Sequence, residues 1–166
     1  MSRLLAGAGL AAALAVFGAG SWSYVQARTD DDLAYARARD AALADGKAAV
    51  AALSTLDASS KERAEDGIST WKTVTAGPLR KELSGLKPAA GASAKASVTD
   101  AALTALDDHA GTARLIATLR VDTMAKGATS PTTARKRLEA TLDRAEDGTW
   151  KVRALKAVPV GEVAAQ

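Results

Sequence analysis

The C-terminal half of the chain alternates polar and apolar residues over four stretches, and only short segments separate them. Alternation with a period of two is typical of a half-buried β-strand. The expected strands span Ala94 to Leu106, Ala113 to Asp122, Ala134 to Asp143 and Trp150 to Val160. Because connections this short force consecutive strands to pair antiparallel, the pattern predicts a four-stranded meander.

The apolar positions predict which side of each strand faces a core. In the first two strands these are Ala94, Ala96, Val98, Ala102 and Leu106, then Ala113, Leu115, Ala117, Leu119 and Val121. In the last two they are Ala134, Leu138, Ala140 and Leu142, then Trp150, Val152, Ala154, Val158 and Val160. The expected turns are residues 107–111, 126–131 and 146–149, which are rich in Gly, Asp and Thr.

Three helices are expected before the sheet. Acidic residues at 30–32 favour a helix start, and good helix formers continue through Ala58, with Gly46 either dividing this helix or weakening it. A second helix is predicted from Lys61 to about Thr75, capped by Ser59 or Ser60. Its expected inward residues are Ile68, Trp71 and Val74. A third, short helix is predicted with Pro78 in its first turn, and it continues through Leu79, Leu83 and Leu86.

An uncharged, almost wholly apolar segment runs from Leu4 to Gly20. As a helix, and extended to Val25, it would cross a hydrocarbon core of about 30 Å, with Trp22 and Tyr24 at the interface. We expect a membrane anchor over residues 1–28, a domain over 29–160 and a flexible tail over 161–166. The alternative is a cleaved signal peptide that ends near Ala27. Arginines on both sides leave the orientation open.

Composition excludes several classes of function. The chain has no cysteine, which removes disulfides, thiolate metal sites and cysteine nucleophiles. It carries a net charge of +3, but only 4% of its residues are aromatic and no basic cluster is interleaved with aromatic residues. Nucleic-acid binding is therefore not expected. With the anchor set aside, roughly 130 residues remain, enough for one α+β domain.

Three short segments in order carry a resemblance to a known family. They are Arg37-Ala38-Arg39-Asp40-Ala41-Ala42, then Thr75-Ala76-Gly77-Pro78-Leu79, then Asp147-Gly148-Thr149-Trp150-Lys151-Val152. Together with the N-terminal apolar segment, they make the chain similar to actinobacterial Mce-associated membrane proteins. Helices followed by a bent antiparallel sheet also resemble the nuclear-transport-factor-two-like (SnoaL-like) cone fold.

The resemblance implies an accessory protein of a lipid or sterol transport system in the cell envelope. It implies a single-pass protein of the cytoplasmic membrane, with its C-terminal domain outside the cytoplasm and Mce complex subunits or other envelope membrane proteins as partners. The family offers no catalytic residues, so we expect a non-enzymatic protein that acts through protein contacts, without cofactor or metal.

The alternative is a small-molecule-binding or isomerase-like domain that uses the cone cavity. Such a site needs an acid as base and a hydrogen-bond donor for an oxyanion. Its candidates are Tyr35, Asp40, Asp57, Asp122 and Asp143, although each acid is as easily a solvated partner of an arginine. A third reading is an anchored or secreted structural protein.

Three further groups of residues have a structural reading that we favour over a functional one. His109 is expected to be a solvated turn residue, and Trp71 and Trp150 to anchor the core. Arginines at one face of the sheet predict either an ordinary hydrated surface or a patch for an acidic partner. They are Arg114, Arg120, Arg135 and Arg137.

Overall fold

The computed structural model describes residues 30–159. They fall into two compact units, one ending at Ala38 and one beginning at Arg39, and each is described by itself. Residues 30–38 are helical. The expected anchor and the expected tail, residues 1–28 and 161–166, lie outside the described residues. No helix within 30–159 combines the length and the apolar character needed to cross a bilayer.

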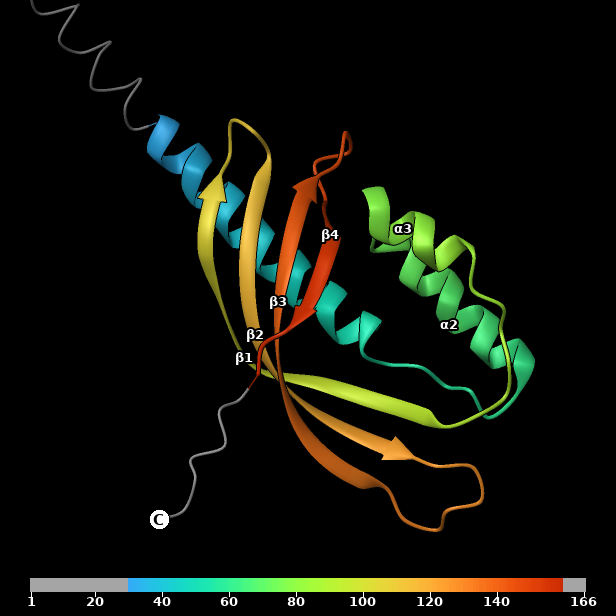
Figure 1. Ribbon diagram of the computed structural model, residues 1–166. Coiled ribbons are helices and arrows are strands. Elements are labelled where there is room, and N and C mark those ends of the chain that lie inside the picture. Colours follow the sequence, from blue (N-terminus) through green and yellow to red (C-terminus); the bar gives the residue numbers. More distant parts are fainter. Residues whose placement is uncertain (1–29, 160–166) are drawn as a thin grey trace, which may run out of the picture. The chain divides into compact units, whose positions relative to one another are not determined.

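The unit that begins at Arg39 contains one sheet of four strands. These are β1 (Ser93–Asp107), β2 (Thr112–Met124), β3 (Thr132–Arg144) and β4 (Trp150–Ala157). They lie in the order β1-β2-β3-β4 and every neighbouring pair is antiparallel, which confirms the predicted meander. Figure 1 shows that the long strands bend midway along their length. Gly111 and Gly148 have φ of +64° and +83° in two connecting turns, a conformation that favours glycine.

Three helical segments accompany the sheet, as predicted. The first helix continues to residue 53, and α2 (Lys61–Thr73) and α3 (Gly77–Ser84) follow. Ser60 caps α2, with its hydroxyl accepting a hydrogen bond from the Arg63 backbone N–H at 3.3 Å. Pro78 lies in the first turn of α3, as expected. Leu86, however, lies beyond the end of α3 and is 47% exposed, so its predicted inward position was wrong.

The first helix ends five residues before the predicted end at Ala58. Leu56 instead adopts a bridge to Ala94 of β1, with backbone hydrogen bonds of 2.8 Å in both directions. Gly46 neither divides nor ends the helix. A Cβ there would lie 2.9 Å from Leu142 Cδ1, so this glycine allows the helix to approach the sheet closely.

The core lies between the helices and one face of the sheet. The predicted inward residues of β2 are all buried, and Ala140, Leu142, Trp150 and Val152 are buried on β3 and β4. Ala134, by contrast, is exposed near the start of β3. The first helix adds Ala42, Ala49 and Val50 to the core.

Three bulges change the predicted faces of β1 and β4. The β1 register shifts at Thr99 and at Thr104, and the hydroxyls of these threonines donate to the carbonyls of Thr118 and Arg114 on β2. Each extra residue shifts the alternation by one position, so that the side chains after the bulge face the opposite side of the sheet from the one predicted. As a result Ala101 and Leu103 pack on the core in place of Ala102, which is exposed.

The third bulge lies on β4. The register with β3 shifts between Thr141 and Leu142, which leaves Arg153 as the extra residue. Leu155 therefore packs against the core, the role that simple alternation had assigned to Ala154. Local periodicity does not reveal such a shift, because only the pairing with the neighbouring strand defines it.

Two of the segments that carry the family resemblance meet in space. Thr75 forms a parallel bridge with Val152, and the backbone bonds Ala76 N–H to Val152 O and Val152 N–H to Val74 O both measure 3.0 Å. Thr75 is fully buried, and its hydroxyl donates to the carbonyl of Trp71 at 2.9 Å. These segments thus join the link between α2 and α3 to the edge of β4.

Candidate functional site

The space between the helices and the sheet, where a cone-fold enzyme would hold its substrate, is filled by aliphatic side chains. Leu115, Leu119, Leu142, Val50 and Val152 are each fully buried there. Within residues 30–159, Thr75 is the one polar residue classed as buried, and its hydroxyl is bound to backbone. No acidic side chain is classed as buried in this part of the chain.

The residues considered for catalysis lie at the surface. Tyr35, in the N-terminal unit, is 44% exposed. The side chain of Asp40 is 76% exposed and lies 3.7 Å from Arg39. Asp143 is partly buried on the outer face of the sheet, opposite Lys151, and lies 3.6 Å from Arg153. Asp122 accepts hydrogen bonds from Thr133 and Arg120. No acid among these faces the packed interior.

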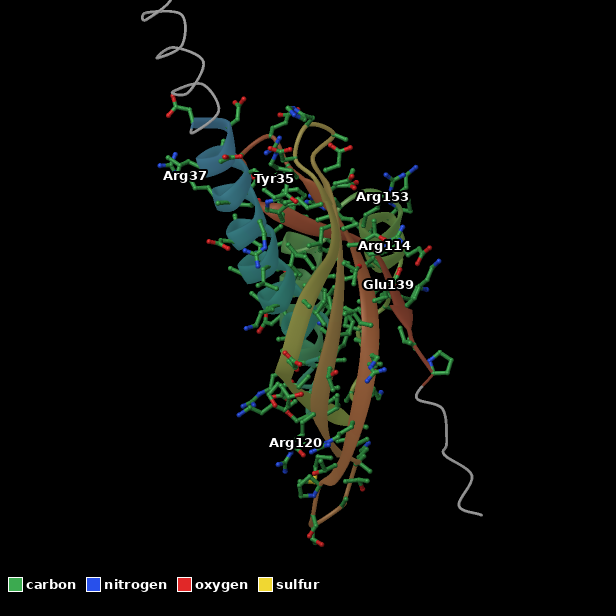
Figure 2. All side chains as sticks on the ribbon, turned by 90° about the vertical axis from the view of Figure 1, so that its left-hand side faces the viewer. Tyr35, Arg37, Arg114, Arg120, Glu139 and Arg153 are labelled. Carbon is green, nitrogen blue, oxygen red and sulfur yellow. The ribbon has the colours of Figure 1, made fainter. Side chains whose placement is uncertain are left out.

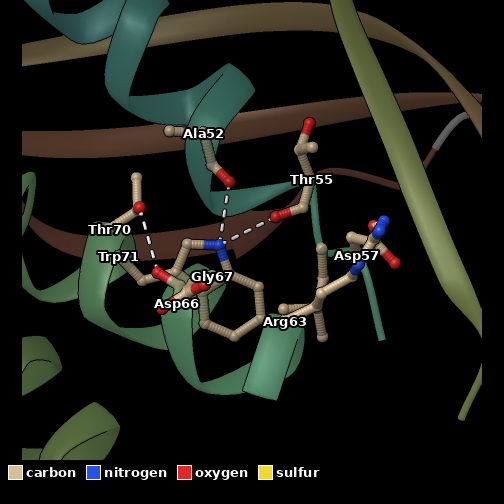
Figure 3. A pocket seen from close by; sticks show the side chains of 9 residues that line it. Ala52, Thr55, Asp57, Arg63, Asp66, Gly67, Thr70 and Trp71 are labelled. Atoms are coloured by element: carbon tan, nitrogen blue, oxygen red, sulfur yellow. Dashed lines mark hydrogen bonds and ion pairs between the residues drawn. The ribbon is translucent and has the colours of Figure 1, made fainter. Parts of the chain in front are cut away.

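An open groove lies beside Trp71, between the end of the first helix and α2 (Figure 3). It has a volume of about 370 Å³, and its lining residues are Ala52, Thr55, Leu56, Asp57, Arg63, Asp66, Gly67, Thr70 and Trp71. The Trp71 indole N–H donates to the carbonyls of Ala52 at 2.8 Å and Thr55 at 3.0 Å. Those bonds fix the ring as part of the groove wall. Trp71 is half-buried and does not belong to the main core cluster, so its predicted role as a core anchor was wrong.

A second open pocket of about 430 Å³ is lined in part by the connector between the first helix and α2, residues 54–60. It shares Thr55, Leu56 and Asp57 with the first groove, and Met124 and Pro131 contribute to its far wall. Thr55 holds this connector against β1, because its hydroxyl accepts a hydrogen bond from the Ala96 N–H at 3.0 Å. The two pockets therefore share one strip of backbone, which is hydrogen-bonded to β1.

Asp57 organises the charged rim between the two pockets. Its carboxylate accepts hydrogen bonds from the Ser59 N–H at 3.0 Å, the Arg63 guanidinium at 2.8 Å and the Ser93 hydroxyl at 3.3 Å. The bonds from Ser59, and then the contact with Arg63, hold the pKa of Asp57 well below its usual range. The aspartate thus stays ionised and serves as a structural clamp, and it is a poor candidate for a general base.

The lowered pKa gives a pH dependence of known sign. A carboxylate with a depressed pKa in the folded state stabilises the fold above its unfolded-state pKa of about 3.9, and the contribution is lost as pH falls below that value. We expect Asp57→Asn to lower the melting temperature near neutral pH, and its deficit relative to the parent to shrink between about pH 5 and about pH 2. A deficit that is constant across this range in thermal melts would contradict the clamp.

The outer face of the sheet carries the predicted arginines, and Figure 2 shows part of it. Arg114 on β2 lies 3.6 Å from Glu139 on β3, and Arg120 lies 3.3 Å from Asp122. Arg135 stands directly opposite Arg120, and Arg137 opposite Thr118. His109 is exposed in the turn between β1 and β2, as expected for a solvated residue. Within the described range no group of acids and histidine has the arrangement of a metal site.

Sequence reasoning considered Asp57 only as an acid and missed the groove. Local spacing did carry a signal for its turn, since Asp57 and Ser59 have the separation of an Asx turn. The contact of Asp57 with Ser93 and that of Thr55 with Ala96, in contrast, join residues that are 36 and 41 positions apart. No local pattern reports such pairs.

Comparisons with known proteins support the fold. Neither models of protein families nor the sequences of curated proteins give a match. Solved structures, in contrast, do give matches in fold. An Ntf2-like protein involved in plasmid conjugation has a TM-score of 0.50 and 11% identity, covering 75% of this chain, and the chain spans half the length of that protein.

Two further structures match along almost their whole length. A periplasmic fragment of TraM has a TM-score of 0.51 and 14% identity, covering 71% of this chain and 95% of the fragment. An IcmL-like type IV secretion system protein from Legionella pneumophila has a TM-score of 0.52 and 13% identity, covering 75% and 94%. The fold is thus nuclear-transport-factor-two-like, as the arrangement of helices and sheet predicted.

Proposed function

We propose that this protein is a membrane-anchored, non-enzymatic accessory protein of an Mce-type lipid or sterol transport system, and that it acts through contacts with other envelope proteins. The observation that carries the proposal is the aliphatic filling of the interior. An enzyme of this fold needs buried polar groups that converge on a substrate, whereas here the acids pair with arginines at the surface.

Two further observations support an assembly role outside the cytoplasm. The same fold occurs in a periplasmic fragment of TraM and in an IcmL-like type IV secretion system protein, although these likenesses bear on the fold alone. The apolar N-terminal segment with Trp22 and Tyr24 has the features of a membrane anchor. We propose that the domain lies on the outer side of the cytoplasmic membrane, tethered beside its partners.

The test is complementation of a deletion strain, with lipid uptake as the readout. Single changes of the candidate catalytic residues, Tyr35→Phe, Asp40→Asn, Asp122→Asn and Asp143→Asn, should leave uptake nearly unchanged. Removal of the apolar segment from Leu4 to Tyr24, with the domain exported in soluble form, should impair it. The reason is that a tether supplies a high local concentration of partner that a free domain lacks.

Two controls make the outcome specific. Each point variant is purified and its melting temperature measured, so that loss of folding is separated from loss of activity. The soluble domain is quantified in the exported fraction to match the amount of the anchored protein. Loss of uptake from one correctly folded point variant would favour an enzyme over an assembly protein.

A second candidate function is the binding of an apolar small molecule in the groove beside Trp71. The groove volume of about 370 Å³ lies within the range of ligand sites, and Ala52, Leu56 and Trp71 supply apolar wall. Titration of the full chain with a fluorescent fatty acid would test this reading. The supporting result is an increase in the fluorescence of the fatty acid with the parent protein and no increase with Gly67→Leu. The leucine side chain of this variant would enter the groove.

A further inference from the structure

The first half of β3 has a strand neighbour on one side only. β2 pairs with β3 from Thr132 to Asp143, whereas β4 pairs with β3 only from Leu138 to Arg144. Residues 132–137 therefore form a free sheet edge within the described part of the chain, apart from one bond from the Val158 N–H to the Arg137 carbonyl at 2.9 Å. In Figure 1 this half of β3 forms the lower border of the bent sheet.

The bond from Val158 defines which backbone groups face the free edge. In an antiparallel ladder, successive residues direct their N–H and C=O groups to opposite sides. Since Arg137 bonds toward Val158, the groups of Arg135 and Thr133 also point to the free edge. The backbone N–H and C=O groups of Ala134 and Lys136 point toward β2. An added strand that continues the line of β4 would therefore find donors and acceptors in correct alternation.

The other long edge of the sheet lacks this regularity. β1 has bulges at Thr99 and Thr104, and its first residues are already bridged by Leu56. Bulges are a common means of blocking an edge against further pairing. β3 pairs with β2 from Thr132 to Asp143 without a register shift, and no proline lies within it. Residues 132–137 of β3 therefore keep a regular register with β2, and their free side can pair with a further strand.

The side chains along this edge are basic. Arg135 and Arg137 lie on the outer face and Lys136 on the opposite face, and all three are exposed. Within residues 30–159, no carboxylate lies within ion-pair distance of any of them. Arg120 on β2 stands directly opposite Arg135, an arrangement of like charges that costs stability. Arg120 is paired with Asp122 at 3.3 Å, whereas Arg135 and Arg137 have no such partner within residues 30–159. Charged residues alone can protect an edge from aggregation, but two exposed arginines of this kind also fit an acidic partner.

We propose that residues 133–137 of β3 bind an extended acidic segment of a partner protein, which adds antiparallel to β3 in line with β4. Its backbone would pair with Thr133 and Arg135, and its carboxylates would meet the guanidinium groups of Arg135 and Arg137. Main-chain bonds supply affinity in this mode of recognition, and the charged side chains select the partner. The proposal rests on the assembly role inferred above and names the kind of surface that a partner presents.

The test uses the full chain in mild detergent and a capped peptide that alternates Glu and Val, with a Lys-Val peptide of the same length as the reversed-charge control. Hydrogen exchange measured by NMR should show about tenfold slower exchange at the Thr133 and Arg135 amides with the Glu-Val peptide. The Lys-Val peptide should leave both amides unchanged. Equal protection by the two peptides, or none by either, would overturn the proposal.

Variants separate the backbone contribution from the charge contribution. Arg135→Pro removes an N–H that faces the free edge and leaves the ladder to β2 intact, so it should abolish peptide binding in a folded protein. Arg135→Glu combined with Arg137→Glu should weaken binding about tenfold or more. Arg80→Glu, an exposed change on α3, is the matched control and should have no effect. Binding that survives Arg135→Pro would exclude strand addition.

The exchange measurement on the parent protein does not depend on whether a variant folds. It also separates this proposal from the proposed transport function. If the peptide protects the two amides while the deletion strain shows no defect in lipid uptake, the docking edge stands and the transport role fails. If uptake depends on the tether while the amides stay unprotected, the transport role stands and the docking edge fails.

Discussion

Replacing Trp150 with alanine is expected to lower the free energy of unfolding by about 3–5 kcal/mol. Trp150 opens β4, is only 3% exposed and packs within the main core cluster. Its backbone N–H also donates to Asp45 of the first helix at 2.9 Å, so the residue joins helix and sheet. Urea unfolding of the variant and the parent, followed by far-UV circular dichroism, gives the difference directly.

His109→Ala is the matched control for this change. His109 is exposed in the β1–β2 turn, and its replacement should alter the free energy of unfolding by less than about 0.5 kcal/mol. Equal unfolding midpoints for Trp150→Ala and the parent would mean that β4 presents its other face to the core. A large effect of His109→Ala would show that the turn is tied to the rest of the domain.

Leu142→Ala should destabilise the domain by about 2–5 kcal/mol, because Leu142 is fully buried and its removal leaves a cavity beside the first helix. The same cavity predicts coupling with Gly46. A Cβ at Gly46 would lie 2.9 Å from Leu142 Cδ1 and 3.2 Å from Leu115 Cδ2. In the Leu142→Ala protein, a Cβ at position 46 no longer meets the Leu142 side chain. Gly46→Ala should then stabilise the helix by about 1 kcal/mol, because alanine has a higher helix propensity than glycine.

A double-mutant cycle over Gly46→Ala and Leu142→Ala measures this coupling. Gly46→Ala should be less favourable in the parent than in the Leu142→Ala protein. Ile116→Ala, on the outer face of β2, is the control partner and should combine additively with Gly46→Ala. Additive energies in both cycles would show that Gly46 does not press against the sheet through Leu142.

The acids and arginines show why the candidate site was harder to predict than the fold. Asp57 was recognisable as a possible acid, but its bonds to Arg63 and Ser93 make it a clamp, and these partners come from different elements. The arginines on the sheet were assigned to one face correctly by alternation. That Arg120 and Arg135 stand opposite each other follows only from the register of β2 with β3.

The amino-acid sequence by itself determined the four-stranded antiparallel meander, the buried face of β2 and the start of α2 at Lys61. These features depend on interactions between residues close in the chain: alternation, short turns and capping. Tertiary structure alone decided the end of the first helix at residue 53, the bulges at Thr99, Thr104 and Arg153, and the free edge of β3. In each of these cases the deciding hydrogen bonds join distant segments, and a local pattern carries no information about a partner that lies elsewhere in the chain.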